Sequence, residues 1–212
     1  MNSKEEQLQA ISEMRIMMER SSRFLSLSGL AGVIVGLYAI IGILFAYFIL
    51  DRSLLDPVDY NILLNSEGGL AMQKFLPLLL DSLVVLFISI ITGSIFAIRN
   101  ARKKQYIVWD ATSKRLLINM MVPLLTGAIY CFILLSKMQI AFIAPATLIF
   151  YGLALFTASR YTIDDVRNLG VLQIMLGLVA CYYMQYGLIF WAVGFGLLHI
   201  VYGLFIYNKY EK

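Results

Sequence analysis

The sequence predicts an all-α polytopic membrane protein, and two observations support this fold class. Hydrophobic residues make up 60% of the 212 residues and charged residues only 14%, whereas a soluble globular chain carries about 25% charged residues. A helix needs about 20 apolar residues to cross the hydrocarbon core, and runs of this length recur along the whole chain. The composition excludes a soluble enzyme, a disordered scaffold and a disulfide-stapled secreted domain.

The expected organisation is an N-terminal helix followed by six transmembrane helices arranged as three hairpins. Residues 1–24 predict a cytoplasmic amphipathic helix, since Leu8, Ile11, Met14 and Met18 recur every three or four residues. This helix either lies on the inner leaflet or docks on a cytoplasmic partner or a second protomer. Residues 25–212 form the transmembrane domain, with spans expected at 25–50, 75–98, 116–136, 140–159, 169–186 and 188–207.

The boundaries of the spans follow from charges and turn signals. The first span is uncharged, and the second is interrupted only by Asp81. Between them, residues 51–74 contain the turn signals Asp56-Pro57 and Gly68-Gly69 around several leucines, which favours a short helix on the outer interface. Only a short link at residues 137–139 separates the third span from the fourth, which predicts a tight hairpin.

The distribution of basic residues predicts the orientation in the membrane. Six spans place both termini on one side, and fourteen of the seventeen Lys and Arg residues fall in the segments on that side. Basic residues collect in cytoplasmic loops. We therefore expect both termini in the cytoplasm and residues 51–74 outside.

The stretch from Glu13 to Gly42 reads EMRIMMERSSRFLSLSGLAGVIVGLYAIIG. It resembles the N-terminal signature of a group of small, uncharacterised bacterial inner-membrane proteins. The resemblance covers about the first 42 residues and implies a multi-pass protein of the bacterial inner membrane. It implies no activity and no site residue.

Ionisable groups inside a membrane are candidates for function, because burying one costs roughly 2.5–3.5 kcal/mol on insertion scales. Asp81 lies about 27 Å along the helix from Arg99, near the outer edge of the hydrocarbon, so it is either an interfacial residue or a cation or proton site. His199, the only histidine, falls near the midplane. It is either a neutral imidazole bonded to a Tyr or Ser of another helix, or a proton-relay or ligand site, with Tyr202 one turn away.

Two stripes of small residues predict close helix packing. Ser28, Gly32 and Gly36 stand four residues apart in the first span, and the second span carries a similar stripe at Ser89, Gly93 and Ala97. Small side chains let neighbouring backbones approach closely. We expect the two stripes to face each other within one chain, the alternative being a dimerisation motif.

The sequence contains no GxSxG or HExxH motif, no Gly-rich phosphate loop and no pair of carboxylates within a span. We therefore expect a non-enzymatic scaffold, sensor or accessory subunit without a cofactor or metal. Its partners would be the bilayer and a cytoplasmic protein or a second copy. The basic loop 99–115 would meet anionic headgroups or that partner rather than nucleic acid. The alternative is a small transporter or channel with a cavity near His199, Tyr202 and Asp81.

Overall fold

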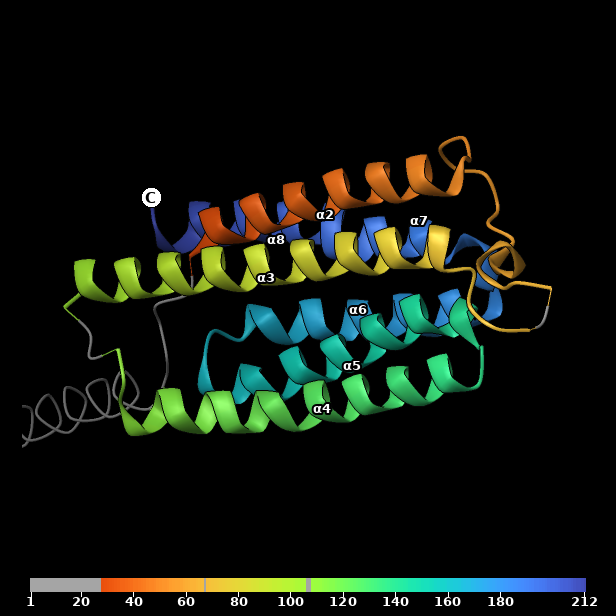
Figure 1. Ribbon diagram of the computed structural model, residues 1–212. Helices are drawn as coiled ribbons and strands as arrows, with labels where there is room; N and C mark the ends of the chain where they lie inside the picture. Colours follow the sequence, from red (N-terminus) through yellow and green to blue (C-terminus); the bar gives the residue numbers. More distant parts are fainter. Residues whose placement is uncertain (1–27, 67, 106–107) are drawn as a thin grey trace, which may run out of the picture.

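The computed structural model describes residues 28–66, 68–105 and 108–212 as a helical bundle (Figure 1). Regular structure in these ranges is helical, and the pairing of Leu64 with Leu70 is an isolated bridge. The all-α fold class is therefore confirmed. The expected N-terminal helix, residues 1–24, lies outside the described residues.

The described residues form six helical rods that run along the bundle. Five of these rods are long and apolar enough to cross a membrane, and the remaining one, α6, is not among those five. The rods are α2 (Gly29–Leu50), α3 (Met72–Lys103), α4 (Ala111–Ser136), α5 (Ile143–Ala158) with its flanking turns, α6 (Asp165–Tyr182), and a continuous rod from Met184 to Tyr210 that contains α7 (Gly187–Trp191), η5 (Ala192–Leu198) and α8 (His199–Tyr210). α6 is 18 residues long, and Asp165 and Arg167 lie in its first turn.

The packing of the rods differs from three separate hairpins. α2 contacts α3, and α4 contacts α5, as expected for consecutive spans. However, α6 packs mainly on α5, whereas α8 packs mainly on α2 (Figure 1). The first rod therefore pairs with the last, because both carry glycines that let their backbones meet.

The segment between α2 and α3 folds onto the end of the bundle. The sequence predicted a short helix here, and the described residues of the segment contain the 3₁₀ helix η1 (Tyr60–Leu63). Val58 and Leu63 are buried against Ile43 and Leu50 of α2. These apolar side chains pack on protein instead of lipid, because backbone hydrogen bonds such as Val58 N–H to the Gln185 carbonyl (2.8 Å) hold the loop down.

Polar contacts close the opposite end of the bundle. Glu211 accepts hydrogen bonds from the Ser28 hydroxyl and from the Gly29 N–H at the start of α2. Lys209 Nζ donates to Asp165 at 2.8 Å, which holds the pKa of that carboxyl below its ordinary value. The C-terminus is therefore tied to the first residues of both α2 and α6.

Candidate functional site: a buried polar chain

His199, at the start of α8, lies in the core with 7% of its surface exposed. Its Nδ1 is 2.9 Å from the Gly194 carbonyl, and its Nε2 is 2.8 Å from the Tyr151 hydroxyl of α5. A carbonyl oxygen can only accept, so Nδ1 carries the proton. In the neutral ring Nε2 then accepts from Tyr151. Both ring nitrogens of a neutral imidazole are satisfied by this arrangement.

Gln173 extends the polar chain to α6. Its side chain is fully buried, and Nε2 donates to the same Gly194 carbonyl at 2.8 Å. One carbonyl therefore accepts from Gln173 and from His199. The Gln173 Oε1 atom is buried and has no hydrogen-bond partner among the described residues. The chain Gln173, Gly194, His199 and Tyr151 connects α5, α6 and the last rod.

A π-helical segment positions the shared carbonyl. Residues Ala192–Leu198 form η5, in which backbone hydrogen bonds span five residues instead of four. His199 directly follows this π-helical segment, and its Nδ1 lies 2.9 Å from the carbonyl oxygen of Gly194, five residues before it. Gly194 lies directly against Gln173 and Leu148, so a side chain at 194 would displace both. Such π-turns occur frequently at functional sites.

Aromatic rings surround the histidine. Phe195 lies between Tyr151 and Trp191, with ring centroids 5.0 and 4.7 Å away, and stacks on His199 at 5.9 Å. Hydrogen bonds in such apolar surroundings are stronger than in water, and breaking them costs more. The hydrogen bonds of this polar chain can fix the positions of α5, α6 and the last rod relative to one another. Within the described ranges, no group of three or more His, Cys, Asp or Glu residues could hold a metal ion.

The structure brings together only part of the predicted polar site. The expected bond between His199 and a tyrosine of another helix is present, and the tyrosine is Tyr151. Tyr202 contacts Phe205 instead, with ring centroids 6.4 Å apart. Asp81 lies beside Gly42 on the α3 side of α2, away from α8. These three predicted residues therefore do not line one cavity.

The predicted pairing of the two small-residue stripes is wrong. A Cβ atom at Gly32 would lie 3.1 Å from the Gly203 Cα, and one at Gly36 would lie 2.7 Å from the Gly196 carbonyl oxygen. The stripe on α2 thus faces the last rod, and Ser28 bonds Glu211 at its C-terminal end. A Cβ at Gly93 would meet no atom within 4 Å. The stripe of Ser89, Gly93 and Ala97 is therefore open at its central glycine, although Asp81 and Val85 of the same helix meet Gly42 of α2.

Sequence reasoning missed Gln173 and did not single out Tyr151. Gln173 was detectable in principle, because it is the only strongly polar side chain between Leu169 and Cys181 of an expected span. Such a residue usually faces other helices inside a membrane. Which tyrosine of the C-terminal half faces His199 depends on how each helix is rotated about its own axis. The π-turn changes that rotation and has no simple signature in the sequence.

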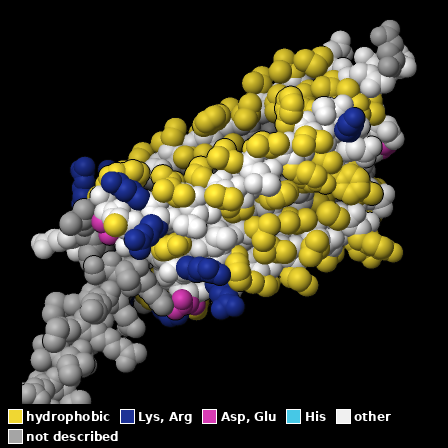
Figure 2. Space-filling model, turned by 90° about the horizontal axis from the view of Figure 1, so that it is seen from below, with side chains coloured by type: hydrophobic (Ala, Val, Ile, Leu, Met, Phe, Trp, Pro, Cys, Tyr) yellow, Lys and Arg dark blue, Asp and Glu magenta, His cyan; other side chains and the backbone are white. Residues whose placement is uncertain are grey.

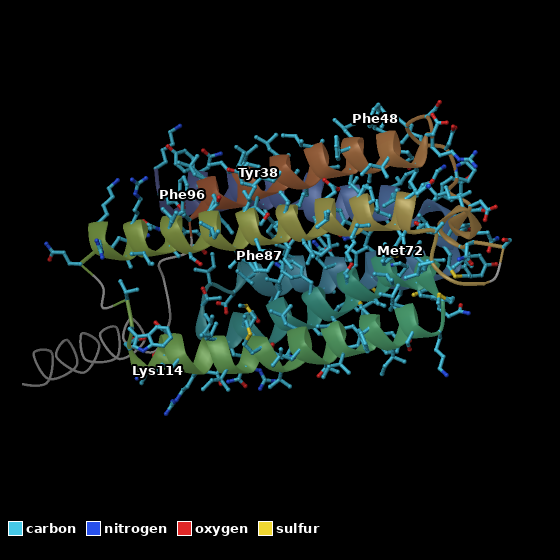
Figure 3. All side chains as sticks on the ribbon, viewed as in Figure 1. Tyr38, Phe48, Met72, Phe87, Phe96 and Lys114 are labelled. Carbon is cyan, nitrogen blue, oxygen red and sulfur yellow. The ribbon has the colours of Figure 1, made fainter. Side chains whose placement is uncertain are left out.

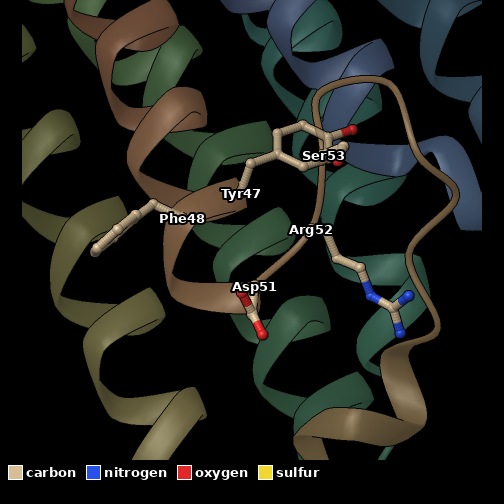
Figure 4. Close-up of a pocket in the computed structure, with 5 residues that line it drawn as sticks. All are labelled: Tyr47, Phe48, Asp51, Arg52 and Ser53. Atoms are coloured by element: carbon tan, nitrogen blue, oxygen red, sulfur yellow. The ribbon is translucent and has the colours of Figure 1, made fainter.

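Two shallow hollows lie elsewhere. One, of about 460 Å³, lies at the C-terminal end of α2 and is lined by Tyr47, Phe48, Asp51, Arg52 and Ser53 (Figure 4). The other, of about 490 Å³, lies between α2 and α3. Neither is lined by His199, Tyr151 or Gln173.

Comparisons with models of protein families, with curated proteins and with solved structures find no match to this chain.

Proposed function

We propose that the protein is a non-enzymatic scaffold, sensor or accessory subunit of the bacterial inner membrane. It binds a cytoplasmic partner with an acidic surface. One observation carries this proposal: five cations of α3 and α4 at one end of the bundle are exposed and have no ion-pair partner within residues 28–66, 68–105 and 108–212. The exposed set comprises Arg99, Arg102, Lys103, Lys114 and Arg115.

The positions of these cations favour a protein surface as their partner. Arg102 and Lys103 form the last turn of α3, and Lys114 lies in the first turn of α4, its Nζ 6.0 Å from the Trp109 ring (Figure 3). Hydrophobic side chains cover the flank of the bundle and several Lys and Arg side chains gather at one end (Figure 2). Arginine, lysine and an exposed aromatic residue together suit recognition of carboxylates.

The core supports a rigid subunit better than a transport path. The polar groups of His199, Tyr151 and Gln173 bond across helices, and none of these residues lines either hollow. A transporter must offer polar groups to its substrate. Among the described residues, the buried side-chain atoms without a hydrogen-bond partner are Gln173 Oε1 and the hydroxyls of Tyr47 and Tyr60.

Neutralising the inner cations is expected to weaken partner binding about tenfold, since two exposed ion pairs contribute roughly 0.5–1 kcal/mol each. The variant is Arg102→Gln with Lys103→Gln. The matched control is Arg52→Gln with Lys137→Gln, two exposed cations at the other end. The measurement is the amount of a stoichiometric partner that co-purifies with the full chain from native membranes in mild detergent. Equal recovery with both variants, or solute flux in proteoliposomes without any partner, would contradict the proposal.

We further propose that α6 is the sixth span and that both termini are cytoplasmic. The start of α2, the end of α3 and the C-terminus lie at one end of the bundle, which supports this topology (Figure 1). With both native cysteines replaced by alanine, Asn61→Cys should react with an impermeant thiol reagent added outside intact cells, whereas Gln105→Cys should react only after lysis. Both positions are exposed, so access depends on the side of the membrane. Labelling of Gln105→Cys alone in intact cells would reverse the orientation.

A further inference from the structure

A groove between α2 and α3 combines an apolar lining with one carboxylate. We call it the α2–α3 groove. Its volume is about 490 Å³, within the range of pockets that hold small molecules. It opens to the membrane side, because Phe48 is 77% exposed and Ile41 62% exposed. The lining residues are Tyr38, Ile41, Gly42, Leu44, Phe45, Phe48, Asp81, Val84, Val85 and Ile88.

Asp81 is the only carboxylate in this lining, and it has no hydrogen-bond or ion-pair partner among the described residues. Gly42 faces it: a Cβ there would lie 3.6 Å from Asp81 Oδ2. Gly42 is eight residues from the outer end of α2, so the carboxylate lies about 12 Å below that end. This is deeper than the sequence suggested, because α3 begins at Met72, nine residues before Asp81.

Aromatic rings lie along the same groove. Phe45 and Phe48 stack with ring centroids 6.1 Å apart, and Tyr38 lies on the same helix (Figure 3). The faces of such rings attract cations, and the attraction grows where water is excluded. An uncompensated carboxylate beside aromatic rings is complementary to a positive charge carried on an apolar body.

We propose that the α2–α3 groove binds a lipophilic organic cation that enters from the membrane. The Asp81 carboxylate is its counter-ion, and Phe45, Phe48 and Tyr38 contact its apolar groups. The ammonium group of a bilayer lipid stays at the headgroup level, whereas this carboxylate lies about 12 Å along the helix axis from the end of α2. The depth therefore favours a cation that is itself soluble in hydrocarbon. This inference does not depend on the proposed cytoplasmic partner.

The test uses radiolabelled tetraphenylphosphonium and equilibrium dialysis of the purified full chain in detergent. Wild type should bind the probe saturably at one site per chain, and Asp81→Asn should weaken binding at least about tenfold, as expected for the loss of a desolvated counter-ion. Asp51→Asn, a second acid at the end of α2 outside this groove, should bind like wild type. Triphenylphosphine oxide, an uncharged compound of similar shape, should not displace the probe.

A second variant keeps the test decisive if Asp81→Asn does not fold. Phe48 is largely exposed, so Phe48→Ala should leave the melting temperature unchanged and weaken probe binding about threefold or more. Absence of saturable binding to wild type would overturn the proposal. Unchanged affinity in a folded Asp81→Asn variant, or equal displacement by the uncharged compound, would also overturn it.

Discussion

Replacing Gly36 with leucine is expected to destabilise the bundle by about 3 kcal/mol or more, at the upper end of the cost of overpacking. A Cβ atom at this position would lie 2.7 Å from the Gly196 carbonyl oxygen and 3.0 Å from the Ile200 backbone nitrogen. Backbone atoms cannot rotate away as a side chain can. The whole last rod would have to move from α2.

The same substitution at Gly93 provides the matched control. Gly93 is also inside a transmembrane helix, but a Cβ there would meet no atom within 4 Å. Gly93→Leu should therefore leave stability unchanged or raise it by up to about 1 kcal/mol, since glycine disfavours helix. The free energy of unfolding can be measured by titration from mild detergent into SDS, followed by circular dichroism. Equal destabilisation by both variants would mean that α2 does not pack on the last rod.

Tyr151→Phe is expected to lower the free energy of unfolding by about 1–2 kcal/mol. The substitution removes only the hydroxyl that bonds His199 Nε2 at 2.8 Å. His199 is 7% exposed, so its Nε2 would remain buried without a partner. Hydrogen bonds between transmembrane helices contribute about 0.6–1.7 kcal/mol, and an unsatisfied buried acceptor adds to the loss.

Tyr130→Phe is the control for this prediction. Tyr130 lies in α4, which is long and apolar enough to cross a membrane, and its ring contacts that of Phe150 at a centroid distance of 5.7 Å, but its side chain is 44% exposed. Removing its hydroxyl should change stability by less than about 0.5 kcal/mol. The same SDS titration compares the two variants. Equal free energies of unfolding for Tyr151→Phe and Tyr130→Phe would mean that the polar chain does not stabilise the fold.

The rods themselves could be predicted because the bilayer imposes a length on any apolar helix. The expected span 25–50 became Gly29–Leu50, and 188–207 lies within the rod from Met184 to Tyr210. The ends shifted where polar residues continue a helix. In α4, for example, Asp110 accepts from the Ser113 N–H and starts the helix at Ala111.

The partners of the rods could not be predicted, because the spacing of small residues does not say which helix they face. The stripe at Gly32 and Gly36 resembles the one containing Gly93, yet only the first contacts another backbone. The polar site was predicted in part for the same reason. His199 was identified by its ionisable side chain and its expected depth. Tyr151 and Gln173 join the same polar chain only through the packing of α5 and α6.

Pairing the first rod with the last has a consequence for biosynthesis. Ser28 and Glu211, which bond to each other at 3.3 Å, are 183 residues apart in the chain. At roughly 5–20 residues per second, a ribosome needs about 10–40 seconds to make the intervening segment. During that time, the glycine face of α2 has left the translocon without its partner. The newly inserted chain therefore remains an open intermediate, exposed to quality-control proteases, until translation is nearly complete.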